Sequence, residues 1–224
     1  LWLGGYEMTN LAGYLEHTLL KPEATVPDII ALCDEAKKYQ LRAVCVNPCY
    51  VSLARHLLTG TWVQVVTVIG FPLGATYTEV KVLEAKMAVA NHADEIDMVM
   101  NISVFKTGDY AAVEEDIRQV VTAAKPRPVK VIIETCLLTD EEKRRATQLV
   151  IAGGARFVKT STGFAHGGAT VADVELLRAE ADKGKIGVKA AGGIRDVATA
   201  QALVAAGADR LGTSAGGAIA AATV

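Results

Sequence analysis

The sequence has few aromatic residues and no excess of basic charge. Aromatic residues make up only 5% of the 224 positions whereas 51% are hydrophobic, so a core must be built mainly from Ala, Val, Leu and Ile. Lys and Arg (23 together) nearly balance Asp and Glu (25), which leaves no positive surplus to neutralise a phosphate backbone. This composition suits an α/β protein and argues against nucleic acid as a partner.

The sequence also lacks a long apolar segment. Gly, Asp, Glu or Lys interrupts every hydrophobic run before it reaches the roughly 20 residues that a membrane helix needs. The first residues, Leu1 to Tyr6, have no basic flank and are too short for a signal peptide. We therefore expect a cytoplasmic protein with no membrane partner. We expect a single domain over residues 1–224, with residues 1–8 as an extension outside the fold.

Cysteine is scarce, and no residues have the spacing of a metal site. The four cysteines are Cys33, Cys45, Cys49 and Cys136. They are scattered in apolar segments without the paired spacing of a zinc site. His56, His92 and His166 have no clustered carboxylates at the spacing of metal ligands. These observations predict reduced, mostly buried thiols and no metal.

Short runs rich in β-branched residues alternate with helical patterns along the whole sequence. The runs that predict strands are 15–20, 43–46, 63–69, 95–100, 129–134, 157–161, 186–189 and 210–212. Such alternating units, with no linker between them, predict a parallel sheet. The sheet is either closed into a barrel or open and doubly wound.

Capping residues and apolar spacing predict helices between the strands. Thr25 is placed as an N-cap before Pro27, and Thr139 with Glu142 has the pattern of a capping box. Apolar residues recur at helical spacing in two sets, Val80, Leu83, Met87 and Ala90, and Val113, Ile117 and Val120. We expect each set to pack against the sheet.

An internal repetition favours the closed barrel. Three segments align without gaps and in one register: 154–159, 207–212 and 92–97. If they lead into the fourth, sixth and eighth strands, Asp97, Lys159 and Gly212 lie at one height on alternate strands, as in one interior layer of a barrel. The prediction is a single-domain (β/α)8 barrel, the TIM barrel fold, with an acid, an amine and a gap in one layer.

Two lysines at strand ends are the main candidates for chemistry. Lys159 is followed by a small polar run that ends at Gly163, and Lys189 lies on the next strand. Catalytic groups in this fold come from the carboxyl ends of strands. Two neighbouring amines lower the pKa of at least one of them, and a neutral amine can attack a carbonyl to form an imine. The alternative is that each lysine extends to solvent.

Other polar residues on the strands are further candidates. Asp97 lies in an apolar strand, where it needs a partner, and beside two lysines we predict a proton-transfer role rather than only a structural ion pair. Lys130 and Glu134 alternate with apolar residues and are predicted to form an ion pair that is structural or supports the catalytic residues, with a direct part in catalysis as the alternative. His17 and Thr18 are expected at the cavity mouth.

Glycine-rich turns follow the last two predicted strands, at 191–194 and 212–217. In barrel enzymes the backbone N–H groups of these loops frequently bind phosphate, although glycines are also common in tight turns of any function. The residues predicted to bind a substrate phosphate are Gly163, Gly192, Gly193, Gly212 and Ser214.

Six blocks of sequence together resemble one enzyme family. The blocks are HTLLKP (17–22), VIGFPLG (68–74), DEIDMV (94–99), KVIIET (130–135), VKTSTG (158–163) and VKAAGGIR (188–195). In this order, from about residue 17 to residue 214, they are similar to deoxyribose-phosphate aldolase.

The resemblance implies a reaction. The family reversibly cleaves 2-deoxy-D-ribose 5-phosphate into D-glyceraldehyde 3-phosphate and acetaldehyde through a lysine Schiff base, with no cofactor. It implies that Lys159 forms the imine, that Lys189 tunes it, and that Asp97 shares a proton relay with Lys189. It also implies a phosphosugar partner and a homodimer or homotetramer. Phe164 and Ala215 depart from a lysine and a serine that other members carry near the phosphate.

Two alternatives remain open from the sequence. One is another phosphosugar barrel enzyme, such as a metal-dependent aldolase or an isomerase, with the same phosphate site. The other is a non-catalytic barrel that binds a sugar phosphate. A chelator would abolish the activity of a metal-dependent aldolase, and a binding protein would have no need of the amine.

Overall fold

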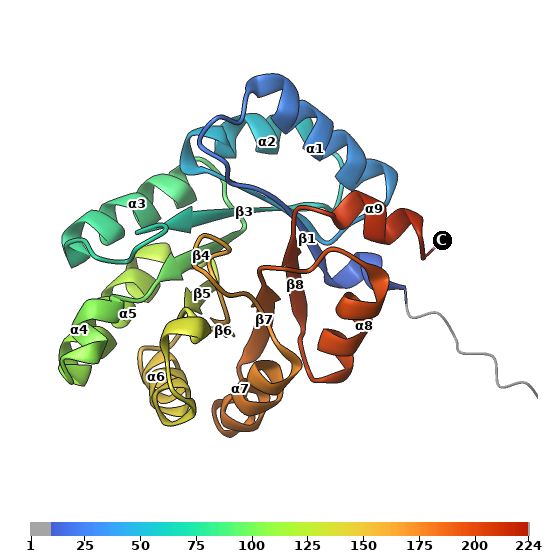
Figure 1. The fold of residues 1–224 in the computed structure, drawn as a ribbon. Coiled ribbons are helices and arrows are strands. Elements are labelled where there is room, and N and C mark those ends of the chain that lie inside the picture. Colours follow the sequence, from blue (N-terminus) through green and yellow to red (C-terminus); the bar gives the residue numbers. More distant parts are fainter. Residues whose placement is uncertain (1–9, 224) are drawn as a thin grey trace, which may run out of the picture.

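The strands form a closed parallel barrel. The computed structural model describes residues 10–223, so the prediction about residues 1–8 lies outside the described residues. Strand order around the barrel follows the chain from β1 to β8, and β8 pairs with β1. The predicted (β/α)8 barrel is confirmed, with its helices arranged around the strands (Figure 1).

Every predicted strand is present, with ends shifted by no more than two residues. The strands are β1 (Leu15–Leu19), β2 (Ala43–Val46), β3 (Gln64–Ile69), β4 (Glu95–Val99), β5 (Val129–Ile132), β6 (Phe157–Lys159), β7 (Gly187–Ala191) and β8 (Arg210–Thr213). Strand β5 ends earlier than predicted, because Glu134 takes a left-handed backbone conformation with φ of 55°.

The helices begin where capping residues predict. The α-helices are α1 (Val26–Lys38), α2 (Val51–Leu57), α3 (Thr78–Ala90), α4 (Ile102–Lys106), α5 (Tyr110–Ala124), α6 (Asp140–Ala152), α7 (Val171–Gly184), α8 (Val197–Ala205) and α9 (Gly216–Ala221). Short 3-10 helices are η1 (Leu11–Tyr14), η2 (Pro48–Tyr50) and η3 (Thr135–Leu137). Capping boxes at Thr25 and at Thr139 open α1 and α6, as predicted.

Helix α3 turns a different face to the protein from the one predicted. Its large apolar residues Val80, Leu83 and Met87 are 42%, 58% and 57% exposed. The side chains that it buries are Lys81, Ala85 and Ala88. Lys81 tolerates burial because its Nζ donates to Asp116 on α5, at 2.7 Å from Oδ2. The prediction for α3 was therefore wrong. The face predicted for α5 is buried, as Val113, Ile117 and Val120 show.

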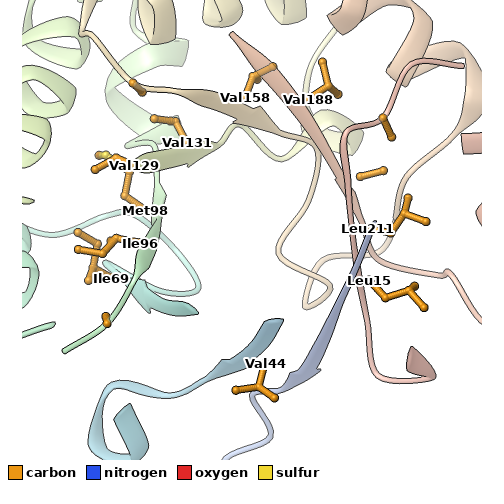
Figure 2. Close-up of a cluster of buried hydrophobic side chains, with 14 of the residues drawn as sticks. Leu15, Val44, Ile69, Ile96, Met98, Val129, Val131, Val158, Val188 and Leu211 are labelled. Carbon is orange, nitrogen blue, oxygen red and sulfur yellow. The ribbon is translucent and has the colours of Figure 1, made fainter. Parts of the chain in front are cut away.

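Two hydrophobic clusters lie on opposite sides of the strands. The larger fills the space between strands and helices, and Figure 2 shows its labelled side chains on the outer side of the ring of strands. The smaller consists of Leu20, Ala43, Cys45, Val66 and Val68, with Phe71 packed against it. Residues paired across parallel strands share a face, and Val68 pairs with Asp97, so the smaller cluster lies inside the barrel with Asp97.

Candidate active site

Strand register brings the three predicted catalytic residues together inside the barrel. Lys159 on β6 pairs with Lys189 on β7, and Asp97 on β4 pairs with Lys130 on β5. Residues directly opposite on neighbouring strands point to the same side, so the four side chains converge. Lys159 is 3% exposed and the other three are fully buried.

Asp97 is the centre of this group. Its Oδ2 accepts hydrogen bonds from Lys159 Nζ at 2.8 Å and from Lys189 Nζ at 2.6 Å. Its Oδ1 accepts one from Lys130 Nζ at 3.0 Å. The predicted partnership of Asp97 with both lysines is therefore present in the structure, and a third lysine joins it.

Two further carboxylates, Glu16 on β1 and Glu95 on β4, complete the charged layer. Glu16 Oε2 accepts a hydrogen bond from Lys189, and Glu16 Oε1 lies 3.5 Å from Lys130 Nζ. Glu95 Oε2 lies 2.5 Å from the same Lys130 amine. We call the six residues Glu16, Glu95, Asp97, Lys130, Lys159 and Lys189 the interior charge network.

The lysines hold the carboxylates of the network in their charged form. Burial opposes ionisation of Asp97, but Lys130, Lys159 and Lys189 together outweigh burial and hold the pKa of Asp97 well below its ordinary value. Burial likewise opposes ionisation of Glu16, and Lys130 and Lys189 lower its pKa in spite of this. Both groups are anions at neutral pH.

The lysine amines differ from one another in their pKa. Burial lowers the pKa of Lys159; the attraction of Asp97 opposes this change, and repulsion from Lys189 adds to it. For Lys189, burial acts in the same direction, but Asp97 and Glu16 raise the pKa above its ordinary value. Lys130 behaves like Lys189. Of the three, Lys159 is thus the amine most easily deprotonated, as the sequence predicted for one lysine of the pair.

A cavity of about 360 Å³ opens at the carboxyl end of the barrel, above Lys159. Of the three lysines in the interior charge network, only Lys159 lines it. All residues predicted to bind phosphate also line it, namely Gly163, Gly192, Gly193, Gly212 and Ser214. The cavity therefore joins the candidate nucleophile to the candidate phosphate site.

Two of the glycines are required by close approaches. A Cβ on Gly212 would lie 3.1 Å from Lys189 Cε and 3.1 Å from Ala191 Cβ, so this position provides the predicted gap beside the lysine. Gly192 has a φ of 86°, and a Cβ there would lie 3.0 Å from Gly168 Cα. Gly212 thus leaves room for the Lys189 side chain, and Gly192 allows the loops after β6 and β7 to approach each other.

Some cavity residues were not found from the sequence. Lys21, after β1, and Arg195, after β7, both line the cavity, and no carboxylate of the described residues lies within ion-pair distance of either. Both lie inside blocks that resemble the aldolase family, Lys21 in block 17–22 and Arg195 in block 188–195. Their position beyond a strand end on the carboxyl side is the signal that could have identified them.

Two other predictions, for Lys130 and for His17, were wrong because the structure gives these residues different partners. Lys130 does not pair with Glu134, whose carboxylate instead accepts hydrogen bonds from the backbone N–H and hydroxyl of Thr162. Thr18 lines the cavity as expected, but His17 does not, because its Nε2 lies 2.9 Å from Glu35 Oε2 on α1.

The cysteines are free thiols, and only Cys33 and Cys45 of the four are buried.

The described residues contain neither a grouped set of metal ligands nor a helix suited to a membrane. Among residues 10–223, no three or more His, Cys, Asp and Glu side chains are grouped so that they could hold a metal ion. Within the same residues, no helix has both the length and the apolar character needed to cross a membrane. Independence from metals stays a prediction that needs a measurement.

The arrangement defines a class of protein. A buried amine that lines a cavity at the carboxyl end of a parallel barrel, beside a buried carboxylate, is an arrangement found in barrel enzymes that act on carbonyl compounds. The sequence signature of the DeoC/LacD family aldolases matches residues 11–222. The chain belongs to this family.

Known relatives agree with this membership. The deoxyribose-phosphate aldolase of Streptococcus equi subsp. zooepidemicus is 56% identical over 207 residues, which are 92% of this chain and 94% of the relative. That of Deinococcus radiodurans is 55% identical with the same coverage. The tetrameric deoxyribose phosphate aldolase structure from Aeropyrum pernix has a TM-score of 0.89 at 36% identity, over 95% of this chain and 90% of that one.

Proposed function

We propose that the protein is a Schiff-base aldolase that reversibly cleaves 2-deoxy-D-ribose 5-phosphate into D-glyceraldehyde 3-phosphate and acetaldehyde. One observation carries the mechanism. Lys159 is the amine of the interior charge network that both reaches the cavity and has a pKa lowered by burial. A neutral amine at the floor of a cavity can attack an aldehyde without help from a metal ion.

The reaction begins with addition of the Lys159 amine to C1 of the open-chain sugar. The carbinolamine that forms takes up a proton from solvent at its hydroxyl group and loses water, which leaves a protonated imine. Asp97, whose Oδ2 lies 2.8 Å from Lys159 Nζ, is placed to balance the positive charge of the imine. The imine nitrogen then serves as the electron sink for the next step.

Cleavage breaks the bond between C2 and C3. A proton leaves the C3 hydroxyl, the C3 carbon becomes the aldehyde of glyceraldehyde 3-phosphate, and the electron pair of the broken bond forms an enamine on Lys159. Asp97 and Lys189 are buried below the cavity, so we assign them the transfer of this proton through an intervening water. The same pair returns a proton to the enamine carbon, and hydrolysis releases acetaldehyde.

The glycine loops are the proposed binding site for the phosphate. Backbone N–H groups beside Gly163, Gly192, Gly193 and Ser214 can donate to its oxygens, and Lys21 and Arg195 add positive charge at the same cavity. Phe164, which departs from the family's lysine, instead packs edge-to-face against Phe71, with ring centroids 5.3 Å apart. We infer that Lys21 and Arg195 compensate for the charge that Phe164 does not carry.

We also propose that the protein is a homodimer or homotetramer of the cytoplasm. The relative from Aeropyrum pernix is described as tetrameric, and α3 exposes the large apolar residues Val80, Leu83 and Met87. The cysteines are free thiols, which agrees with a reducing compartment. Sedimentation equilibrium of the purified protein tests the oligomeric state.

The activity is tested with 2-deoxy-D-ribose 5-phosphate as substrate. We expect equal amounts of acetaldehyde and glyceraldehyde 3-phosphate, measured by coupled dehydrogenase assays, with no loss after exhaustive chelation. Lys159→Ala should reduce turnover by a factor on the order of 10⁵. Loss of activity on chelation would favour a metal-dependent enzyme, and tight binding of the sugar phosphate without turnover would favour a binding protein. Either result would overturn the proposal.

A further inference from the structure

Lys130 closes a ring of alternating charges below the candidate nucleophile. Lys130 contacts Asp97 and Glu16, and Lys189 contacts the same two carboxylates. The ring therefore contains two positive and two negative side chains. Lys159 is outside the ring and touches it only at Asp97 Oδ2.

We propose that Lys130 is a positioning residue for the aldolase reaction, which keeps Asp97 charged and oriented while Lys159 carries no charge. This inference rests on the proposed function, because it assigns the amine chemistry to Lys159. Lys130 holds Oδ1 of Asp97, which leaves Oδ2 to Lys159 and Lys189. Asp97 thus retains a donor on each oxygen when the Lys159 amine is neutral or bound in an imine.

Lys130 cannot act on the substrate directly. It is fully buried, it does not line the cavity, and its amine lies between Asp97 Oδ1 at 3.0 Å and Glu95 Oε2 at 2.5 Å. Any effect on catalysis must pass through Asp97 and the charge balance of the network.

The charge balance gives the inference its measurable consequence. With Lys130 present, the two positive and two negative charges of the ring cancel. The ring then has no net charge that would favour a proton on Lys159. Without Lys130 the ring carries a net negative charge in a region of low dielectric, and this charge attracts a proton to Lys159. Imine formation should then require a higher pH.

The groups that set this balance come from strands on every side of Lys159. They are Glu16 on β1, Cys45 on β2, Glu95 and Asp97 on β4, Lys130 on β5, Lys189 on β7 and Arg210 on β8, with Arg42 just before β2. Arg42 and Arg210 lie at 4.0 Å from Glu95 and at 3.9 Å from Glu16, so neither replaces Lys130 beside Asp97. Lys130 is the cation that faces Asp97 Oδ1.

The test is the pH dependence of imine formation with acetaldehyde. The adduct on Lys159 is reduced with borohydride after short incubations at a series of pH values and is measured by peptide mass spectrometry. For Lys130→Met we expect the midpoint of the profile to move to higher pH by about one unit, with roughly tenfold less adduct at neutral pH. Lys81→Met is the matched control, because Lys81 is also fully buried and paired with a carboxylate, Asp116. It should lower stability and leave the profile in place.

A second variant tests the same charge balance in the opposite direction. Glu95→Gln removes a negative charge beside Lys130, so the midpoint of adduct formation on Lys159 should move to lower pH. If Lys130→Met does not fold, this variant supplies the test of the charge balance. The double variant Lys130→Met with Glu95→Gln should return the midpoint toward that of the wild type. Midpoints of folded variants that stay within 0.2 units (roughly the error of such profiles) or move the wrong way would overturn the role of Lys130. Absence of any Lys159 adduct in the wild type would instead refute the proposed function, and this role with it.

Discussion

The interior of the barrel has two unlike sides. On β2 and β3 the inward residues are mostly apolar, with Cys45 paired to Val66 in the strand register and Gln64, at the start of β3, as the polar exception. From β4 to β7 the inward residues include Asp97, Lys130 and Lys189. The two sides meet where Val68 pairs with Asp97 and where Glu16 pairs with Ala43. The inward-facing side chains of the strands therefore form an apolar core on one side of the barrel and the charged groups of the candidate site on the other.

Burial has different consequences on the two sides. On the apolar side it stabilises the fold by removing hydrocarbon from water, and it raises the pKa of the Cys45 thiol to about 11, which keeps that group neutral. On the charged side burial would be costly for each ion alone, so every ion has an oppositely charged neighbour. On the charged side, burial lowers the pKa of Lys159, whereas Asp97 and Glu16 outweigh burial and raise the pKa of Lys189.

Among variants that contrast the two sides of the barrel, and after loss of Lys159 itself, the largest effect is expected from removing the shared carboxylate. Asp97→Asn keeps the shape of the side chain but leaves Lys130, Lys159 and Lys189 without a common counter-ion. Turnover of 2-deoxy-D-ribose 5-phosphate should fall by about 10²–10⁴ because proton transfer is lost. Circular dichroism checks that the variant is folded. Turnover within threefold of the wild type would show that Asp97 has no part in catalysis.

A charge placed on the apolar side of the barrel interior should lower the stability of the fold and not only the activity. Val66→Asp puts a carboxylate beside Glu95, its register partner, with no cation assigned to it. We expect the free energy of unfolding to fall by about 3–5 kcal/mol, measured by urea denaturation. Val171→Asp is the control at an exposed position, the first residue of α7, and should change it by about 0.5 kcal/mol or less. Equal losses in the two variants would contradict the assignment of Val66 to the barrel interior.

Filling the gap at Gly212 should have an intermediate effect. An added Cβ would lie 3.1 Å from Lys189 Cε, so Gly212→Ala forces the lysine or the strand to move. We expect a loss of about 1–3 kcal/mol in the free energy of unfolding and a lower kcat. Gly13→Ala meets nothing within 4 Å and serves as the control. An unchanged kcat in the folded variant would mean that the position of Lys189 is not critical.

The smallest effect concerns acid stability. The pKa values of Asp97 and Glu16 are lower in the folded protein than in the unfolded chain. A depressed carboxyl pKa contributes stability above the unfolded value, near pH 4, and loses it as the pH falls through the folded value. We therefore expect the free energy of unfolding to decline below about pH 4, and to decline less steeply in Asp97→Asn. If the free energy of unfolding depends on pH in the same way in the wild type and in Asp97→Asn, Asp97 does not contribute to acid stability.

The sequence predicted the layout of the barrel and the central trio of the site. The gapless alignment of three segments placed Asp97, Lys159 and Gly212 in one layer, and the strand spacing placed Lys189 beside Lys159. These predictions worked because strand alternation and parallel register are set by local pattern. The glycines and Ser214 that line the cavity followed from the same rule, whereas Lys21 and Arg195 at the same cavity were not predicted.

What the sequence did not predict depends on contacts between distant segments. Glu16 and Lys130 join the network only because barrel closure brings β1 next to β8 and places β5 beside β4. Glu134 turns away from Lys130 through a left-handed backbone conformation that no local pattern indicates. On α3, the buried face is made of small alanines and an ion-paired Lys81, so the spacing of large apolar residues pointed to the wrong side.

The most direct test of the central claim is to map where acetaldehyde binds covalently. The native protein is incubated with acetaldehyde, reduced with borohydride and digested, and peptide mass spectrometry compares Lys130, Lys159 and Lys189. The account predicts an adduct on Lys159 alone, unchanged by a chelator and absent from Lys159→Ala. An adduct on Lys130 or Lys189, or no adduct on any of the three in folded protein, would contradict it.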